Sequence, residues 1–184
     1  MKEVENRFED EIINPALMLA ISRMKENNNP DTQNKMVQEA MNAKFLVPCI
    51  MQFKPGTEEE PRRDPGNTVV NFRMLKDPND KLFFMVFTDM EEFQKWEDND
   101  KQNVMVLGFD NLASMVASEK SDTGGFVINP SSTNIVFRKE VIKNIVVNRE
   151  KAIAEGKIVR MTGEEARAFR AERNKKEETG GELG

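Results

Sequence analysis

The run KLFFMVF at residues 81–87 limits the possible folds most strongly, because it is apolar at both alternating positions. A strand that is apolar on both faces has to be covered on both sides, so the run predicts a central strand in a sheet that carries helices. Thr88 and Glu91 follow it in a T-x-x-E capping-box pattern. The pattern predicts a short helix that is capped by Thr88 and that turns Phe93 and Trp96 inward or partly inward.

The other apolar runs and turn signals predict an α/β fold of the α+β type, with a single mixed β-sheet of about six strands packed with helices. Pro48 lies inside one expected strand, and because proline lacks an N–H it predicts an edge position or a bulge. The sequence DPND at 77–80 predicts a hairpin turn between two strands. Besides the central strand, we expect strands at 45–53, 68–75, 103–109, 124–129 and 134–138.

Helices are expected at both ends of the chain. Asn14 before Pro15 reads as an N-cap with proline at the first helical position. A second helix is expected to begin near Asp31 or Thr32, and the two helices together predict an N-terminal helical hairpin. A further helix, with an apolar stripe, is expected at 139–156.

The composition along the chain predicts three parts. Residues 1–30 are expected to form an N-terminal helical extension and residues 31–150 the main domain. Residues 151–184 are expected to form a charged C-terminal helix, opened by the capping-box pair Thr162 and Glu165, and a disordered tail. The segment 54–67 is rich in proline, glycine and charge, which predicts a loop.

The residue inventory excludes several kinds of catalytic site. The chain has no histidine and one cysteine, Cys49. A Ser-His or Cys-His nucleophile pair therefore cannot form within the chain, and neither can a zinc site built on histidine or on several cysteines. Any acid–base chemistry would have to use Asp, Glu or Lys. We assign no catalytic, cofactor-binding or metal-binding residue and expect no cofactor. Cys49, in an apolar strand, is interpreted as a buried small hydrophobe.

Charge and hydropathy bear on partners and location. The formal net charge is −5 and the sequence pI about 5.1, which argues against general nucleic-acid binding. No stretch approaches the roughly 20 consecutive apolar residues of a membrane span. The charged N-terminus lacks the apolar core of a signal peptide, and a single cysteine allows no internal disulfide. These features predict a cytoplasmic protein without nucleic-acid or membrane partners.

Two strand-to-helix junctions are candidate ligand sites. Thr88 and Asp89 follow the central strand, and Asp110 and Asn111 follow the strand at 103–109. Helix N-termini offer backbone N–H groups that suit an anion, and ligands often bind where strands of α/β sheets end. The two junctions would face one cleft if their strands were neighbours. The alternative is that these residues only cap their helices.

Two other features could contact a partner. Trp96 with Phe93 is either core packing or an exposed anchor for a protein, since tryptophan is enriched in binding hot spots. Asn129 and Pro130 open the turn of the expected hairpin GGFVINPSSTNIVF at 124–137. Asn129 precedes proline, so it is expected in a β or polyproline conformation, and Pro130 suits the second position of a type I turn. The polar tip is explained by turn chemistry or by contact with a partner.

Three landmarks in this order carry a resemblance to a known family. They are FLVPCI at 45–50, LFFMVFTDMEEFQKW at 82–96, and LGFDNLASMV followed by GGFVINPSSTNIVFRKEVI within 107–142. Together they resemble the N-terminal domain of the SseB family, named for enhanced serine sensitivity and distinct from the secretion-translocon protein of the same name. The resemblance covers roughly residues 32 to 148 and implies the fold and a soluble bacterial protein. It supplies no catalytic residue. Family members often carry a second SseB domain, which we expect this chain to lack.

Two functions from different classes follow. The first is a non-enzymatic interaction module that binds another protein, with a second copy of the chain as one candidate. The second is a domain that binds or senses a small ligand, such as an anion, a nucleotide or an amino acid, at the junctions near Asp89 and Asp110.

Overall fold

The computed structural model describes residues 12–53, 68–118 and 121–157. The expected loop at 54–67 and the expected charged helix after Thr162 lie outside the described residues. The chain divides into two compact units, residues 1–143 and 144–184. All strands of the described part belong to the first unit, which therefore holds the sites considered below.

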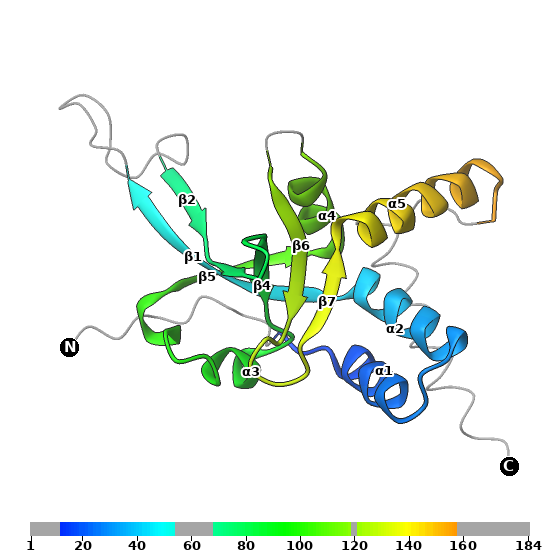
Figure 1. The fold of residues 1–184 in the computed structure, drawn as a ribbon, viewed down its shortest axis with the longest axis horizontal. Helices are drawn as coiled ribbons and strands as arrows, with labels where there is room; N and C mark the ends of the chain where they lie inside the picture. The colour runs from blue at the N-terminus through cyan, green and yellow to red at the C-terminus, as the bar shows by residue number, and fades with distance from the viewer. Residues whose placement is uncertain (1–11, 54–67, 119–120, 158–184) are drawn as a thin grey trace, which may run out of the picture. The chain divides into compact units, whose positions relative to one another are not determined.

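The described elements form an α+β fold, as the sequence predicts (Figure 1). The helices are α1 (Pro15–Glu26), α2 (Pro30–Asn42), α3 (Met90–Gln94), α4 (Phe109–Ala117) and α5 (Lys139–Ala154), with a short 3-10 helix η2 (Asn99–Lys101) after α3. The strands are β1 (Lys44–Phe53), β2 (Thr68–Phe72), β3 (Met74–Lys76), β4 (Leu82–Val86), β5 (Asn103–Gly108), β6 (Thr123–Ile128) and β7 (Ile135–Arg138). None of the described helices has the length and apolar character needed to cross a membrane.

The predicted N-terminal helical hairpin is present, because α1 and α2 lie against each other. Helix α1 begins at Pro15, as predicted. Helix α2 begins at Pro30, slightly earlier than expected. The reason is that the Asn29 side chain accepts hydrogen bonds from the backbone N–H groups of Asp31 and Thr32, both at 3.0 Å, and so caps the helix.

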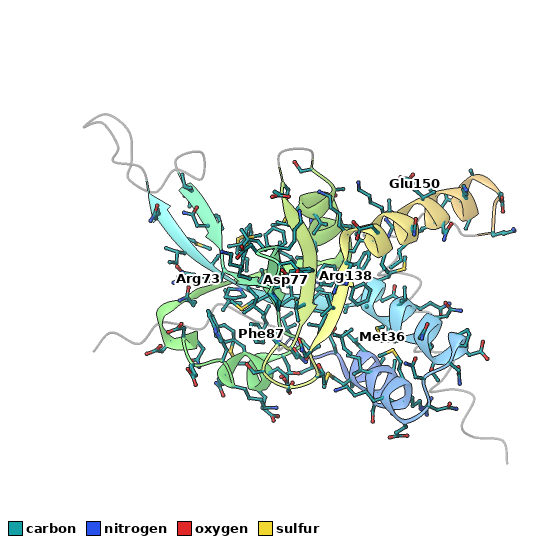
Figure 2. The ribbon with its side chains drawn as sticks, in the orientation of Figure 1. Met36, Arg73, Asp77, Phe87, Arg138 and Glu150 are labelled. Carbon is teal, nitrogen blue, oxygen red and sulfur yellow. The ribbon has the colours of Figure 1, made fainter. Side chains whose placement is uncertain are left out.

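The strands form two sheets, where the sequence predicts one. The first has the order β2-β1-β5 and the second the order β3-β4-β6-β7. The segment at 68–75 reads as a single strand, but it divides at Arg73 into β2, which pairs with β1, and β3, which pairs with β4. The Arg73 N–H donates to the Pro48 carbonyl at 2.9 Å, and the Arg73 carbonyl accepts from Met85 at 3.5 Å. One residue, labelled in Figure 2, thus links the two sheets.

Pro48 lies in the central strand of the first sheet, so the prediction of an edge position or a bulge is wrong. The physical reason lies in the direction of its peptide groups. In an antiparallel ladder the N–H and C=O of one residue face the same side, and the Pro48 carbonyl faces Arg73 rather than its ladder partner Val104 on β5. The missing N–H therefore falls where β2 has ended, and it removes no bond between β1 and β5.

Strand β4 is the central strand that the sequence predicts. It lies between β3 and β6, and four of its residues, Phe83 to Val86, are buried. Strands β6 and β7 form the predicted antiparallel hairpin. Strands β4 and β6 run parallel to each other, with Val86 opposite Ile128. Their carboxyl ends therefore lie side by side, and this places the segments after Val86 and after Ile128 next to each other.

Two groups of aromatic side chains lie on opposite faces of the second sheet, because successive residues of a strand point to opposite sides. The closed cluster contains Phe45, Phe109, Phe126 and Phe137, whose contacting ring centroids are 4.9 to 6.3 Å apart. The open cluster contains Phe87, Phe93 and Trp96, with ring centroids 5.4 to 6.2 Å apart. The closed cluster is fully buried, whereas Trp96 in the open cluster is half-buried.

Candidate functional site

Thr88 and Asp89 follow β4 and lead into α3. Asp89 is the N-cap of this helix, because its Oδ1 accepts from the Glu92 backbone N–H at 2.8 Å. The prediction that Thr88 caps the helix is therefore wrong by one residue. The Thr88 hydroxyl instead donates to Asp89 Oδ2 at 2.8 Å. Thr88 is completely buried, so it acts inside the protein and holds the capping carboxylate in place.

Asn129 follows β6 and lies beside Thr88, because β4 and β6 are parallel neighbours. Its Oδ1 accepts from the Thr88 backbone N–H, and its Nδ2 donates to Thr88 Oγ1, both at 2.9 Å. Asn129 and Thr88 are each 0% exposed. Buried polar groups need such partners, since an unsatisfied donor or acceptor costs about 1–3 kcal/mol. The sequence singles out both residues, but their contact depends on strand pairing that spacing does not reveal.

The backbone of Asn129 is in the left-handed region, with φ of 48°, so the prediction of a β or polyproline conformation is wrong. Its N–H donates to the Val86 carbonyl at 2.9 Å, and its carbonyl accepts from Ser132 and Asn134 at 3.0 and 2.9 Å. These bonds and the buried side chain outweigh the local preference before proline, and asparagine tolerates this conformation. The bond from Ser132 confirms the four-residue turn with Pro130 at its second position.

The tip of the β6–β7 hairpin is attached to α3. The Ser132 hydroxyl donates to Glu92 Oε2, and Lys95 Nζ contacts Glu92 Oε1 at 2.6 Å. The hydrogen bond that Lys95 donates to Glu92 raises the pKa of Lys95, and the nearby carboxylate charges add to the effect. Glu92 is buried in spite of its charge. The sequence does not single out Ser132 or Glu92 as partners, because each lies on a different element.

Asn14 joins the same region from the N-terminal side. It stands at the N-cap position of α1, but its side chain makes no capping bond. Its Nδ2 donates to the carbonyls of Lys44 and Thr88 at 2.8 and 2.6 Å, and its Oδ1 accepts from the Lys44 N–H at 3.3 Å. The sequence does not reveal this bridge, because an asparagine before a helix can either cap the helix or form a hydrogen bond to a distant segment.

Asp110 and Asn111 lie in a different setting from the Thr88 junction. Their strand, β5, pairs with β1 and belongs to the first sheet, so β4 and β5 are not neighbours and the condition for a shared cleft is not met. Both side chains are exposed near the start of α4, and Asn111 Oδ1 accepts from the Gly108 N–H at 3.1 Å. Gly108 pairs with Lys44, which Asn14 connects to the end of β4. The Asn14 side chain thus connects the two junctions through Lys44, the ladder partner of Gly108.

The buried polar side chains of the Thr88 junction each form a hydrogen bond to another protein group. These bonds connect the end of β4, the end of β6 and the start of α3. The described residues include no group of three or more His, Cys, Asp or Glu side chains that could hold a metal ion. Cys49 is fully buried, as expected, and burial raises the pKa of its thiol, which disfavours the nucleophilic thiolate.

An apolar surface surrounds the open cluster. Trp96 stacks on the buried Phe87 at 26° between ring planes and remains half-buried itself. Figure 2 shows where Phe87 lies beside α3. Further half-buried apolar residues pack against the buried residues of this cluster. We call the set the Trp96 patch, and it comprises Trp96, Ile12, Leu75, Met90, Val104 and Val106. It combines segments that are far apart in the sequence.

Acidic side chains flank the Trp96 patch along the chain. Residues 89–101 contain six acidic residues, Asp89, Glu91, Glu92, Glu97, Asp98 and Asp100, against the two lysines Lys95 and Lys101. The side chains of Glu91, Glu97, Asp98 and Asp100 are exposed. Neighbouring acidic charges attract a basic partner and repel an acidic one, and added salt screens both effects.

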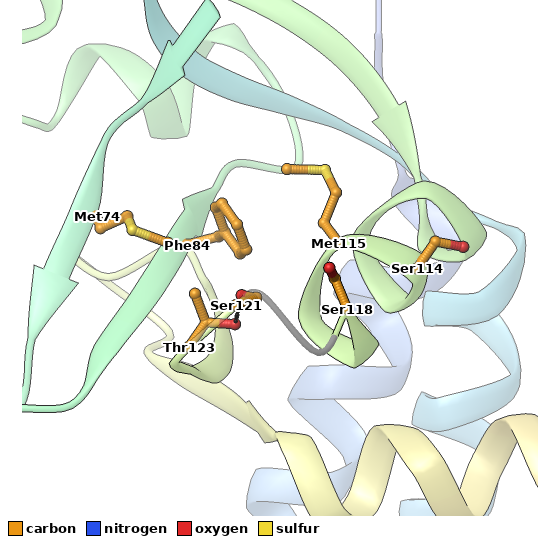
Figure 3. Close-up of a pocket in the computed structure, with 7 residues that line it drawn as sticks. All are labelled: Met74, Phe84, Ser114, Met115, Ser118, Ser121 and Thr123. Atoms are coloured by element: carbon orange, nitrogen blue, oxygen red, sulfur yellow. Dashed lines mark hydrogen bonds between the residues drawn. The ribbon is translucent and has the colours of Figure 1, made fainter.

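A separate pocket lies elsewhere in the first unit (Figure 3). Its volume is about 570 Å³, and its walls come from β3, β4, α4 and β6, with Ser118 and Ser121 between α4 and β6. The lining combines two methionines and a phenylalanine with hydroxyls: Met74, Phe84, Ser114, Met115, Ser118, Ser121 and Thr123. These side chains carry no charge, so they suit a neutral molecule. The sequence gives no sign of the pocket because its walls come from distant segments.

Comparison with known proteins gives one family. A model described as the SseB protein N-terminal domain matches residues 17–144 of the chain. No curated protein and no solved structure matches significantly. The matched region contains β1 to β7 and the helices α2, α3 and α4, together with the Thr88 junction and most of the Trp96 patch.

Proposed function

The chain belongs to the SseB N-terminal domain family, and from that premise we propose that it is a non-enzymatic protein-interaction module. The observation that carries the proposal is the Trp96 patch, where a tryptophan stacked on a buried phenylalanine remains accessible. Tryptophan is over-represented among residues that dominate binding energy. A bacterial origin and a cytoplasmic location are part of the proposal and rest on the family resemblance and on the single cysteine, which allows no internal disulfide.

The polar junction supports this function indirectly. Asn129, Thr88 and Asp89 fix the start of α3, and Ser132 fixes Glu92 within it. Helix α3 carries Met90 and is followed by Trp96, so the network positions part of the patch. A pre-positioned anchor loses less conformational entropy on binding than a mobile one.

The test is capture of a partner and its reconstitution from purified components. A protein that binds reproducibly should bind Trp96→Ala at least tenfold more weakly, and added salt should weaken binding if the acidic residues contribute. Leu19→Ala is the matched control, because Leu19 is an exposed apolar residue of α1, 53% accessible and outside the patch. Equal binding by wild type, Trp96→Ala and Leu19→Ala would reject the patch as the interaction site.

A second candidate function, binding of a small molecule, is favoured by the pocket of about 570 Å³. Its uncharged lining favours a neutral ligand with hydroxyl or carbonyl groups. The earlier expectation of an anion, nucleotide or amino acid near Asp89 and Asp110 stays a prediction. A thermal-shift screen of both ligand classes would distinguish them, because a ligand that binds only the folded protein raises Tm. Met115→Trp, which narrows the pocket, should abolish a shift caused by a pocket ligand.

A further inference from the structure

Strand β5 is an edge strand in the part of the chain that the structure describes. The first sheet has the order β2-β1-β5, so β5 has β1 on one side and no described strand on the other. The direction of its unpaired peptide groups can be derived from β1. Leu46 exchanges two backbone hydrogen bonds with Phe87, each 2.9 Å long, and therefore faces away from β5.

The same reasoning applies at the next position of the ladder. The Pro48 carbonyl accepts from Arg73 and also faces away from β5. The ladder partners of Leu46 and Pro48 on β5 are Val106 and Val104. In an antiparallel ladder such non-bonded pairs alternate with bonded ones, so the N–H and C=O groups of Val104 and Val106 point to the outer edge.

Gly108 supports this direction independently. Two residues beyond Val106, its N–H should face the same outer side, and it donates to the Asn111 side chain instead of to β1. That bond occupies the edge at its carboxyl end. Within the described part of the chain the groups of Val104 and Val106 have no such bond, so among these residues they form a short row of unpaired donors and acceptors.

The sequence of β5 lacks the charges and prolines that often block strand addition. The sequence NVMVLG contains no charged residue and no proline. Natural edge strands are commonly protected by charges, prolines, bulges or short length. The two edges of the second sheet show such protection, since β3 has three residues and β7 has four and ends in Arg138. Strand β5 is longer and apolar.

The apolar side chains of β5 are partly exposed, so an added strand could bury more of their surface. Val104 and Val106 belong to the Trp96 patch, while Met105 and Leu107 point to the other face, and all four are half-buried. A strand added at this edge would lie about 4.8 Å from β5. Its alternate side chains would continue the patch beside Val104 and Val106.

The charges around β5 indicate the kind of strand that fits. The segment that leads into β5 carries the exposed acidic side chains of Glu91, Glu97, Asp98 and Asp100, and Asp110 follows β5. Together these side chains outnumber the two lysines of the same stretch, Lys95 and Lys101. A segment with basic residues at its ends has the complementary charge.

We propose that the outer edge of β5 receives an extended segment of the partner protein, with apolar residues at alternate positions and basic residues at its ends. Strand addition of this type takes its affinity from backbone hydrogen bonds and its specificity from alternate side chains. The inference rests on the proposed interaction function and names the mode of binding at the same site.

The test uses a short peptide of alternating valine and threonine with lysine at both ends, labelled for fluorescence anisotropy. Val104→Pro removes the outward N–H, and Val104→Thr is the matched control that loses the valine but keeps the N–H. Proline is tolerated on edge strands, because no ladder bond is lost there. Circular dichroism establishes that both variants are folded. We expect Val104→Pro to bind at least tenfold more weakly than Val104→Thr.

The outcomes separate the two proposals. Absence of binding to wild-type protein at millimolar peptide, or equal binding by the two variants, overturns strand addition. A protein partner that remains sensitive to Trp96→Ala in that case preserves the interaction function and overturns only the mode. Equal binding of a peptide with glutamate in place of lysine overturns the basic ends. Self-association that is lost in Val104→Pro assigns the edge to a second copy and overturns the choice of occupant.

Discussion

The closed cluster and the open cluster lie on opposite faces of one sheet and use the same kind of side chain to different ends. In the closed cluster, Phe126 stacks on Phe137 at 4.9 Å and is 0% exposed. In the open cluster, Phe87 is equally buried but carries the half-exposed Trp96. The residue type of an aromatic side chain therefore does not show whether it belongs to the core or to a binding surface. What distinguishes a core cluster from a binding candidate is whether the outermost ring is covered.

The largest effect should come from the closed cluster. Phe126→Ala removes a fully buried ring that contacts three other rings, and such substitutions cost about 3–5 kcal/mol. Trp96→Ala, at a half-buried ring, should cost about 1–2 kcal/mol, because less apolar surface is returned to water. Urea denaturation measures both. Equal losses of stability would break the distinction between the two clusters.

A smaller effect is expected at Asn129, where stability and binding can be separated. Asn129→Gly leaves the Thr88 N–H buried without its partner and should cost about 1–3 kcal/mol. Asn129→Ala should cost about 1 kcal/mol more, because alanine is strained at a φ of 48° whereas glycine is not. Both free energies of unfolding can be measured by chemical denaturation.

The same two variants sharpen the comparison between the clusters. Asn129 is buried and outside the Trp96 patch, so folded Asn129→Gly should retain more partner binding than Trp96→Ala. If Asn129→Gly reduced binding as strongly, the start of α3 would be positioned by Asn129 more tightly than its remaining cap at Asp89 suggests.

The smallest effect should be found at Lys95, which supports the open cluster through Glu92. Hydrogen bonding to Glu92 raises the pKa of Lys95, so the charged lysine stabilises the fold at neutral pH. Stability gained by a raised pKa is present below the unfolded-state pKa, about 10.4 for lysine, and is lost as the pH rises through the folded-state pKa. The Tm difference between wild type and Lys95→Gln should therefore shrink in alkaline buffer. A difference that persists there would assign the effect to the alkyl chain of Lys95.

The sequence predicts the elements of this fold better than their arrangement. Residues 81–87 had to be covered on both faces, and β4 is indeed central. The hairpin around Pro130 also follows from local rules. The division of the segment 68–75 at Arg73 does not follow from local rules. Apolar and polar residues alternate there in the same way whether the segment forms one strand or two strands in different sheets. The edge position predicted from Pro48 is wrong for a related reason. The missing N–H of a proline removes a ladder hydrogen bond only if a strand lies on the side that this group would face.

The candidate site shows the same limit. The sequence singles out Thr88, Asp89 and Asn129, yet the hydrogen bonds between Asn129 and Thr88 depend on parallel pairing between β4 and β6. The patch around Trp96 gathers side chains from several elements, so spacing along the chain identifies its anchor without its surroundings.

Asn14 has a consequence for anyone who prepares a shortened form of this protein. The family match begins at residue 17, which makes a fragment cut at that boundary an obvious choice. Such a fragment would lack the side chain that binds the carbonyls of Lys44 and Thr88 and so connects the first strand to the end of β4. The useful boundary for recombinant work therefore lies before Asn14, three residues or more ahead of the recognisable family sequence.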